Sequence, residues 1–354
     1  MESLVRKHKS LGIWMLTALV IGNMVGSGVF LLPSALAQVG TITLYSWCLT
    51  AAGAILLALV FARLSNIFPY TGGPYVYCRK GFGDFIGFQV AYSYWIFLWT
   101  GNAAIAVTFT SYLASFFPEL TTSPLVSFAI TAGVIWFFTL VNCVGVRFAG
   151  VLQLFFTILK FVPLVVIAVI GLFFVKRENL AEFNIMGGSN ISALSAGAML
   201  TLWAFLGLES ASIPADEVDH PARTIARATI LGTVITAILY IAVTIAIMGT
   251  IPSSTLQHST APFADFATSI FGSWGGPAMA IVALTSCLGA LNGWILLAGQ
   301  IPIAAAHDDL FPRKFASLSS RRTPVFGLII SGLLATGTLL LNYTKGFVDS
   351  FVFM

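Results

Sequence analysis

Long apolar runs alternate with short polar connections along the whole chain. Each run reaches the roughly 20 residues that an α-helix needs to cross a lipid bilayer. The pattern therefore predicts an all-α integral membrane protein. Nine complete spans are expected, at residues 11–33, 43–62, 85–117, 125–145, 149–175, 193–213, 228–251, 275–305 and 325–343.

Two of these spans are interrupted by glycine and polar residues. The first is broken at residues 22–29 and the sixth at residues 207–212. Interrupted spans at corresponding positions of two halves are typical of secondary transporters built from repeats. We therefore interpret residues 1–354 as a single transmembrane domain. It divides into a first five-helix repeat at 11–175 and an incomplete, antiparallel second repeat at 193–354.

Composition agrees with a chain embedded in lipid. Hydrophobic residues make up 58% of the 354 residues, charged residues only 8%, and the mean hydropathy is +0.95. Soluble domains carry about 25% charged residues, so the lipid bilayer is the expected surrounding. The net charge of +4 does not point to nucleic acid, and no nucleic-acid partner is expected.

Basic residues are unevenly distributed over the connections. With the N-terminus in the cytoplasm, thirteen of the 17 Lys and Arg residues lie on the cytoplasmic side, three lie outside and Lys160 lies within a span. Cytoplasmic loops of membrane proteins carry such an excess. The sequence therefore predicts a multi-pass protein of the cell inner (plasma) membrane with a cytoplasmic N-terminus.

The interruptions free backbone groups that a regular helix would pair internally. Such groups need partners inside lipid, and a half-helix N-terminus offers N–H donors and a positive dipole to an anion. Residues 26–28 therefore suit an α-carboxylate, and freed carbonyls at 202–206 suit an α-ammonium. The alternative is a packing kink, at which small residues let two helices approach closely.

Three side chains near these interruptions are candidates for substrate contact. Trp203 directly precedes the second interruption and would cover a bound substrate, unless it only packs in the core or at the interface. Trp294 lies in mid-span, where an indole face can hold a cation or simply pack. Asn102, beside Gly101, either contacts the substrate or bonds a neighbouring helix.

Two ionisable residues lie at bilayer depth, where a functional role is the default hypothesis. Glu209 is a candidate proton carrier, and the alternative is a structural pairing with Lys160 or with backbone donors. The ammonium of Lys160 would occupy the place where other carriers bind sodium, or take part in proton coupling. The alternative for Lys160 is a structural tether between helices.

Patterns for catalysis and metal binding are not found in the sequence. The histidines His8, His220, His258 and His307 lie outside the predicted spans, and neither an HExxH motif nor a paired His and Cys set occurs. The four cysteines lack a CxxC pattern and are interpreted as packing or lipid-facing residues. The sequence therefore predicts neither an enzyme nor a metal or other cofactor.

Several motifs recur in the order known from one family. Residues 22–30 resemble the first-helix motif of the amino acid–polyamine–organocation superfamily, and 202–212, 259–263, 293–300 and 308–312 follow in register. Over essentially the whole chain the sequence is most similar to the basic amino acid/polyamine antiporters of the arginine/agmatine exchanger type. The resemblance implies a leucine-transporter-like fold with two inverted five-helix repeats, broken helices 1 and 6, and twelve helices.

The resemblance also implies roles for individual residues. It implies an amino acid/amine antiporter that works by alternating access on a small amino acid or amine such as arginine, and it allows a homodimer. Glu209 would be the proton-sensing carboxylate, with Lys160 as a second coupling residue. The candidate substrate-binding residues are Met24, Ser27, Gly28, Phe97, Leu98, Asn102, Ile105, Trp203, Leu206 and Trp294.

Departures from the family pattern keep two further hypotheses open. Phe97 and Leu98 stand where the arginine/agmatine exchangers have small residues, and Lys160 resembles the fifth-helix lysine of carriers of neutral amino acids. These residues favour a proton-coupled neutral amino acid permease as the alternative. The chain also ends as a further apolar stretch begins, which indicates C-terminal truncation and adds an inactive fragment as a third hypothesis.

Overall fold

The computed structural model describes residues 11–26, 28–180, 182–259 and 261–342. These residues are helical apart from turns, loops and one isolated β-bridge between Leu11 and Val218, so the all-α prediction is confirmed.

The α-helices are α1 (Ile13–Met24), α2 (Leu32–Val39), α3 (Thr43–Ile67), α4 (Pro74–Phe82), α5 (Asp84–Leu113), α6 (Glu119–Thr122), α7 (Pro124–Val144), α8 (Val146–Leu172), α9 (Asn190–Trp203), α10 (Pro221–Thr250), α11 (Ser253–Leu256), α12 (Pro262–Phe271), α13 (Gly275–His307) and α14 (Val325–Asn342). The 3-10 helices are η1 (Gly28–Phe30), η2 (Arg177–Asn179), η3 (Ser210–Ser212), η4 (Ala215–Glu217) and η5 (Arg313–Ala316).

Six helices of the described chain are long and apolar enough to cross a membrane: α3, α5, α7, α8, α10 and α13. They coincide with six of the nine predicted spans. The other three predicted spans fall on the shorter helices α1, α9 and α14, which have 12, 14 and 18 residues. A helix of 12 or 14 residues rises only about 18–21 Å, less than the roughly 30 Å hydrocarbon core.

The predicted connection between α9 and α10 is partly helical. The predicted spans end at residue 213 and resume at residue 228, but α10 already begins at Pro221. Proline is favoured at the first position of a helix, because its missing N–H would have no helical partner there. Arg223 and Arg227 therefore lie in the first two turns of α10.

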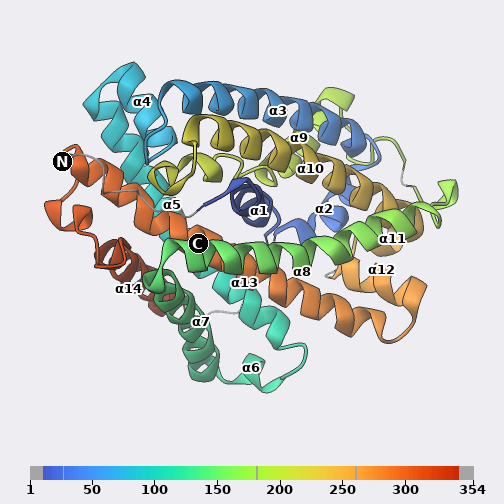
Figure 1. The fold of residues 1–354 in the computed structure, drawn as a ribbon. Coiled ribbons are helices and arrows are strands. Elements are labelled where there is room, and N and C mark those ends of the chain that lie inside the picture. The colour runs from blue at the N-terminus through green and yellow to red at the C-terminus, as the bar shows by residue number, and fades with distance from the viewer. Residues whose placement is uncertain (1–10, 27, 181, 260, 343–354) are drawn as a thin grey trace.

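The helices pack in two groups that meet at α1 and α8 (Figure 1). Helices α3, α9 and α10 form one group, and α5, α7, α13 and α14 form the other. Helices α1 and α8 lie between them and contact both α10 and α13. The interior of the molecule is therefore built around α1, the helix that ends at the first interrupted segment.

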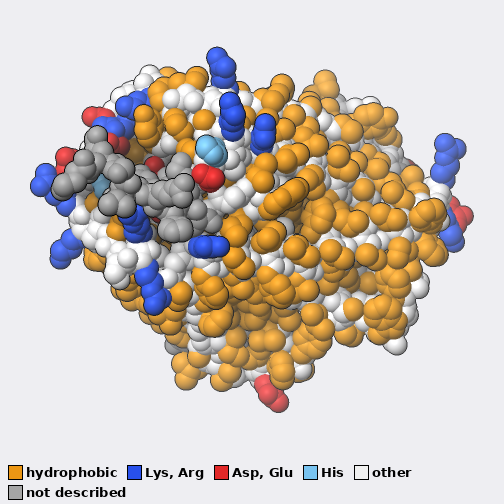
Figure 2. Space-filling model, in the orientation of Figure 1, with side chains coloured by type: hydrophobic (Ala, Val, Ile, Leu, Met, Phe, Trp, Pro, Cys, Tyr) orange, Lys and Arg blue, Asp and Glu red, His pale blue; other side chains and the backbone are white. Residues whose placement is uncertain are grey.

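The outer surface is largely apolar (Figure 2). Figure 2 shows hydrophobic side chains over most of the visible face, with Lys and Arg gathered mainly toward the end of the molecule where α4 lies. Large apolar side chains such as Leu56, Phe155 and Val169 are about half exposed or more. A surface of this kind is expected where helices face lipid.

Candidate functional site

The candidate site lies around two places where a helix stops inside the molecule. The first interruption, described at residues 25 and 26, follows α1 and precedes η1. The second interruption, residues 204–209, follows α9 and precedes η3. Ser27, a predicted substrate contact, lies outside the described residues, and Gly28 is the first residue of η1.

The ammonium of Lys160 binds the carbonyl end of α1. Lys160 is fully buried on α8, and its Nζ donates hydrogen bonds to the carbonyl oxygens of Gly22 and Val25, at 2.6 Å each. The last carbonyls of a helix have no partner within the helix. They also form the negative end of its dipole, so a cation stabilises them. Lys160 thereby links α8 to α1, and the described residues contain no ion pair between Lys160 and Glu209.

Two hydroxyl groups complete the hydrogen bonding of the first interruption. The phenol of Tyr240, on α10, donates to the carbonyl oxygen of Met24 at 2.7 Å. Ser286, on α13, donates to the carbonyl oxygen of Val25 at 3.2 Å. With Lys160, side chains from three helices therefore donate to the carbonyls at the end of α1, where the helix itself supplies few partners.

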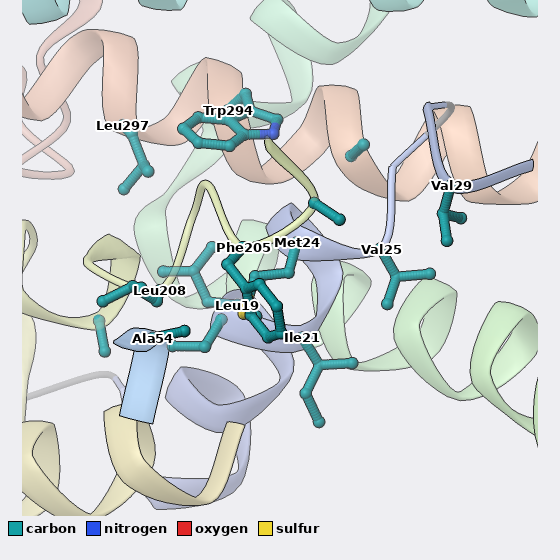
Figure 3. Close-up of a cluster of buried hydrophobic side chains, with 14 of the residues drawn as sticks. Leu19, Ile21, Met24, Val25, Val29, Ala54, Phe205, Leu208, Trp294 and Leu297 are labelled. Atoms are coloured by element: carbon teal, nitrogen blue, oxygen red, sulfur yellow. The ribbon is translucent and has the colours of Figure 1, made fainter. Parts of the chain in front are cut away.

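Asn23, in the last turn of α1, joins the end of this helix to the segment around the second interruption. Its side chain is buried, and Nδ2 donates to Oγ of Ser210 at 2.9 Å across 187 positions of sequence. Gly207 packs against Asn23 with φ +109°, and a Cβ at Gly207 would come within 3.0 Å of the Asn23 backbone. Only glycine adopts this conformation readily. Figure 3 shows the buried apolar side chains of this region, with Met24 beside Phe205 and Trp294 on the other side of a gap from both.

The carboxylate of Glu209 is held within the second interruption. Tyr94 on α5 donates its phenol to Oε1 at 2.5 Å, and the N–H of Gly207 donates to Oε2 at 3.1 Å. One of the two donors to Glu209 is therefore a backbone N–H, the kind of partner considered as the alternative to a role in proton transfer. Tyr94 was not singled out from the sequence, although it lies four and eight residues before Leu98 and Asn102, on the same helical face.

Two aromatic side chains meet between α5 and α13. The rings of Phe97 and Trp294 lie edge to face, with centroids 5.6 Å apart and planes at 85°. Trp294 is buried, whereas Phe97 is 39% exposed. The ring centroid of Tyr94 lies 5.9 Å from that of Phe97. One aromatic row thus extends from the Glu209 carboxylate to Trp294.

The remaining predicted contacts differ in exposure. Leu98 and Asn102 are buried on α5, and Oδ1 of Asn102 has no hydrogen-bond partner among the described residues. Ile105 is half-buried one turn further along. Trp203 and Leu206 are 50% and 42% exposed, so the second interruption presents a face that nothing in the described chain covers.

A buried amide pair behind the first interruption was not recognised in the sequence. Asn292 on α13 donates to Oε1 of Gln153 at 2.8 Å, and both side chains are fully buried. A side chain at Gly22 or Gly293 would collide with this region. The available signal was the glutamine itself, because polar residues within spans usually bond neighbouring helices.

Metal ligation has no support among the described residues. No group of three or more His, Cys, Asp and Glu side chains lies close enough to hold an ion in the part of the chain that the structure describes. The cysteines Cys48, Cys78, Cys143 and Cys287 are all free. The polar atoms of the site are instead suited to hydrogen bonding and to a small charged molecule.

The fold is similar to that of a membrane transporter of known structure. A Na⁺-coupled sialic acid symporter, in a substrate-bound outward-open state, superposes with a TM-score of 0.63 over 95% of this chain and 74% of that chain. Sequence identity is 12%, so the likeness concerns the fold alone. It agrees with the leucine-transporter-like architecture that the sequence resemblance implies.

Residues 11–353 match the amino acid permease family, and the chain belongs to this family. It is 36% identical over 334 residues to the cadaverine/lysine antiporter of Escherichia coli (strain K12), covering 94% of this chain and 75% of that protein. It is 32% identical over 346 residues to the putrescine transporter PotE of the same strain, covering 98% and 79%. The predicted family is confirmed, and the protein is a multi-pass membrane transporter rather than an enzyme.

Proposed function

We propose that the protein exchanges basic amino acids or amines across the cell inner membrane by alternating access. One structural observation carries this proposal: two interrupted helices lie against each other at Asn23 and Ser210, beside the aromatic row on α5 and α13. Freed backbone groups next to aromatic faces suit a zwitterion with a cationic side chain. Family membership and the likeness to a cadaverine/lysine antiporter support the substrate class.

The two interruptions would bind the amino acid backbone. Met24, Ser27 and Gly28 would provide the carboxylate side of the site, where the N-terminus of a half-helix favours an anion. Trp203 and Leu206 would provide the ammonium side. Their exposure leaves Trp203 free to swing over a bound substrate, which is the motion expected of a gate.

The substrate side chain would extend toward α5 and α13. Trp294 offers the face that attracts a cation, and Phe97 narrows the space beside it. The free carbonyl of the Asn102 side chain is an acceptor for a terminal ammonium or guanidinium. Leu98 and Ile105 would line the apolar part of the same pocket.

Lys160 and Glu209 would couple the site to the transport cycle. Lys160 already places a positive charge on the carbonyl end of α1, so a sodium ion is not needed there. Glu209 contacts Tyr94 and Gly207 within the second interruption, so a change in its protonation would alter the bonds that shape this segment.

The same proposal includes the membrane topology. Helix α1 with η1 and α2, and α9 with η3, would form the broken first and sixth spans of two inverted repeats, 11–175 and 193–354. Nine spans would then be complete within the chain. The abundance of Lys and Arg at the end where α4 lies would put that end, with the N-terminus, in the cytoplasm.

Counterflow in proteoliposomes tests the function. Labelled arginine, lysine or cadaverine outside would be exchanged against unlabelled substrate trapped inside, without sodium. Uptake driven by internal basic substrate is the expected result. Uptake of leucine alone would instead favour a neutral permease, and no uptake of any substrate would refute transport by this chain.

The cation-binding role of Trp294 has its own test. Trp294→Leu removes the indole face, so the affinity for lysine and arginine should fall roughly tenfold, or about 1–2 kcal/mol. Affinity is measured as the half-saturating concentration in counterflow. Trp274→Leu, at an exposed tryptophan before α13, is the matched control. An equal loss for leucine and lysine would contradict the cation-binding role.

A further inference from the structure

Three arginines lie close together where α7, α8 and α14 meet at one end of the molecule. Arg147 lies in the first turn of α8, and Arg321 and Arg322 lie in the turn before α14. Nη1 of Arg321 donates to the carbonyl oxygen of Val144, the last residue of α7, over 3.5 Å. Arg147 follows Val144 by only three residues, so segments far apart in the sequence bring their arginines to one region. We call these three residues the arginine cluster.

The turn that carries Arg321 and Arg322 is fastened to the end of α7. Within the turn, the N–H of Arg322 donates to the carbonyl oxygen of Ser319 at 2.8 Å, and the N–H of Ser319 donates to that of Thr323 at 2.9 Å. Thr323 is fully buried, and its Oγ1 donates to the carbonyl oxygen of Cys143 at 3.1 Å. An ordered turn therefore holds both arginines at the surface, where their side chains are exposed.

The arginine cluster has no carboxylate partner within the described chain. The sequence contains no Asp or Glu at residues 120–177 or 310–348, which include α7, α8, α14 and the turn. The acidic residues that begin α5 and follow α13 are already paired with Arg79 or Arg313. The three positive charges of the cluster are therefore left without a balancing negative charge from the helices packed around them.

The place of Arg147 increases this imbalance. The N-terminal end of a helix is the positive end of its dipole, where an anion is favourable and a cation is not. Helix α8 nevertheless has no acidic residue in its first turn and no side-chain cap. An external anion would offset both the dipole and the guanidinium groups. Phosphate suits this role best, because arginine binds it through two parallel N–H donors.

Apolar side chains continue from the arginine cluster along the surface. Leu140 and Val144 on α7, and Phe148 and Val151 on α8, are 45–62% exposed. Their spacings of four and three residues put each pair on one face of its helix. The cluster thus stands at the end of two surfaces that face lipid. A free phosphate ion would make no use of these surfaces, whereas a phospholipid would contact them with its acyl chains.

We propose that the arginine cluster is a binding site for an anionic phospholipid. Its phosphate contacts the guanidinium groups, and its acyl chains lie along the apolar faces of α7 and α8. The site is separate from the substrate site and does not depend on the proposed exchange function. The orientation proposed above puts it in the cytoplasmic leaflet, where basic segments meet anionic head groups. The bound lipid stabilises the end of the molecule where α7, α8 and α14 meet.

Thermal melting of the purified full chain in a neutral detergent, titrated with phosphatidylglycerol, tests the site. The lipid should raise the melting temperature to a plateau, because a ligand that binds only the folded form stabilises it. Phosphatidylcholine with the same acyl chains should need a much higher concentration. Arg147→Gln/Arg321→Gln should raise the half-saturating concentration of phosphatidylglycerol by roughly tenfold or more, since each basic residue near anionic lipid contributes roughly fivefold.

The matched control is Arg223→Gln/Arg313→Gln. It removes the same charge from two exposed arginines of the same predicted cytoplasmic side, and it should leave the half-saturating concentration nearly unchanged. Native mass spectrometry provides a readout that does not depend on melting. From micelles with equal amounts of the two lipids, the wild type and the control should retain phosphatidylglycerol preferentially, and Arg147→Gln/Arg321→Gln should lose this preference.

Three results would overturn the site. Equal weakening in the two double variants would mean that only the overall charge matters. Equal stabilisation by phosphatidylcholine would mean that the surface is an apolar one without head-group recognition. Equal stabilisation by inorganic phosphate at the same concentration would mean that the cluster binds a free anion and not a lipid.

Discussion

The first interruption, after α1, takes its hydrogen bonds from side chains on three other helices, whereas the second, after α9, takes them mainly from its own backbone. Lys160, Tyr240 and Ser286 all donate to carbonyls between Gly22 and Val25. In the second interruption, successive N–H groups from 204 to 212 bond mostly to carbonyls three residues earlier. Burial differs on one face only, because Trp203 and Leu206 are about half exposed although Phe205 between them is as buried as Val25.

This difference suggests that the two interruptions have separate mechanical roles. A segment whose polar groups bind several helices moves only when those helices move with it. A segment with local turn bonds and an exposed face can change shape alone, at the low-stability end of the local openings that proteins undergo. The first interruption would then be the fixed wall of the site and the second its moving wall.

The strongest test of this comparison removes the donor at the first interruption. Lys160→Met leaves the Gly22 carbonyl without its ammonium partner and the Val25 carbonyl with Ser286 alone. A buried carbonyl that loses its partner costs roughly 1–3 kcal/mol, so the free energy of unfolding should fall by about that amount. Thermal melting in detergent measures the change. Lys176→Met, at an exposed lysine, is the control, and equal melting of both variants would contradict a fixed wall.

A smaller effect is expected at the contact between the interruptions. Gly207→Ala places a Cβ against the Asn23 backbone at φ +109°, which should destabilise the protein by about 1–2 kcal/mol. Gly53→Ala, in open space on α3, should be neutral or slightly stabilising, because alanine favours a helix. Equal melting temperatures for the two alanine variants would contradict a close contact between Gly207 and Asn23.

The smallest effect on stability is expected at the second interruption. Trp203→Leu removes a half-exposed side chain and should change the free energy of unfolding by no more than about 0.5 kcal/mol. Counterflow should nevertheless change, because a bound substrate would be covered less well and would leave faster. A loss of stability as large as that of Lys160→Met would remove the distinction between the two walls.

The architecture was largely predictable because lipid imposes it. A run of twenty apolar residues has few options other than a helix, and the spans at α3, α5, α7, α8, α10 and α13 follow from that rule. The spans at α1 and α9 were harder to delimit, because the length of a helix that stops inside the molecule depends on its partners. Glycine and polar residues marked the end of α1, whereas α9 ends at Trp203, four residues before Gly207.

The chemistry of the site was predictable only for residues that are unusual in a span. Lys160 and Glu209 drew attention through their charge, but their partners did not. Tyr94 and Tyr240 are ordinary aromatic residues of apolar helices until packing rotates them toward Glu209 and Met24. Such bonds join residues more than one hundred positions apart, so local sequence patterns carry no information on them.

The contact between Lys160 and α1 also bears on how this lineage can evolve. A lysine codon is one nucleotide away from a threonine codon. That change would leave the carbonyl oxygens of Gly22 and Val25 and the hydroxyl of Ser286 around a space that an ammonium group now fills. Hard cations prefer oxygen ligands of this kind. A single point mutation is therefore enough to exchange an ammonium group for a set of oxygen ligands at the end of α1.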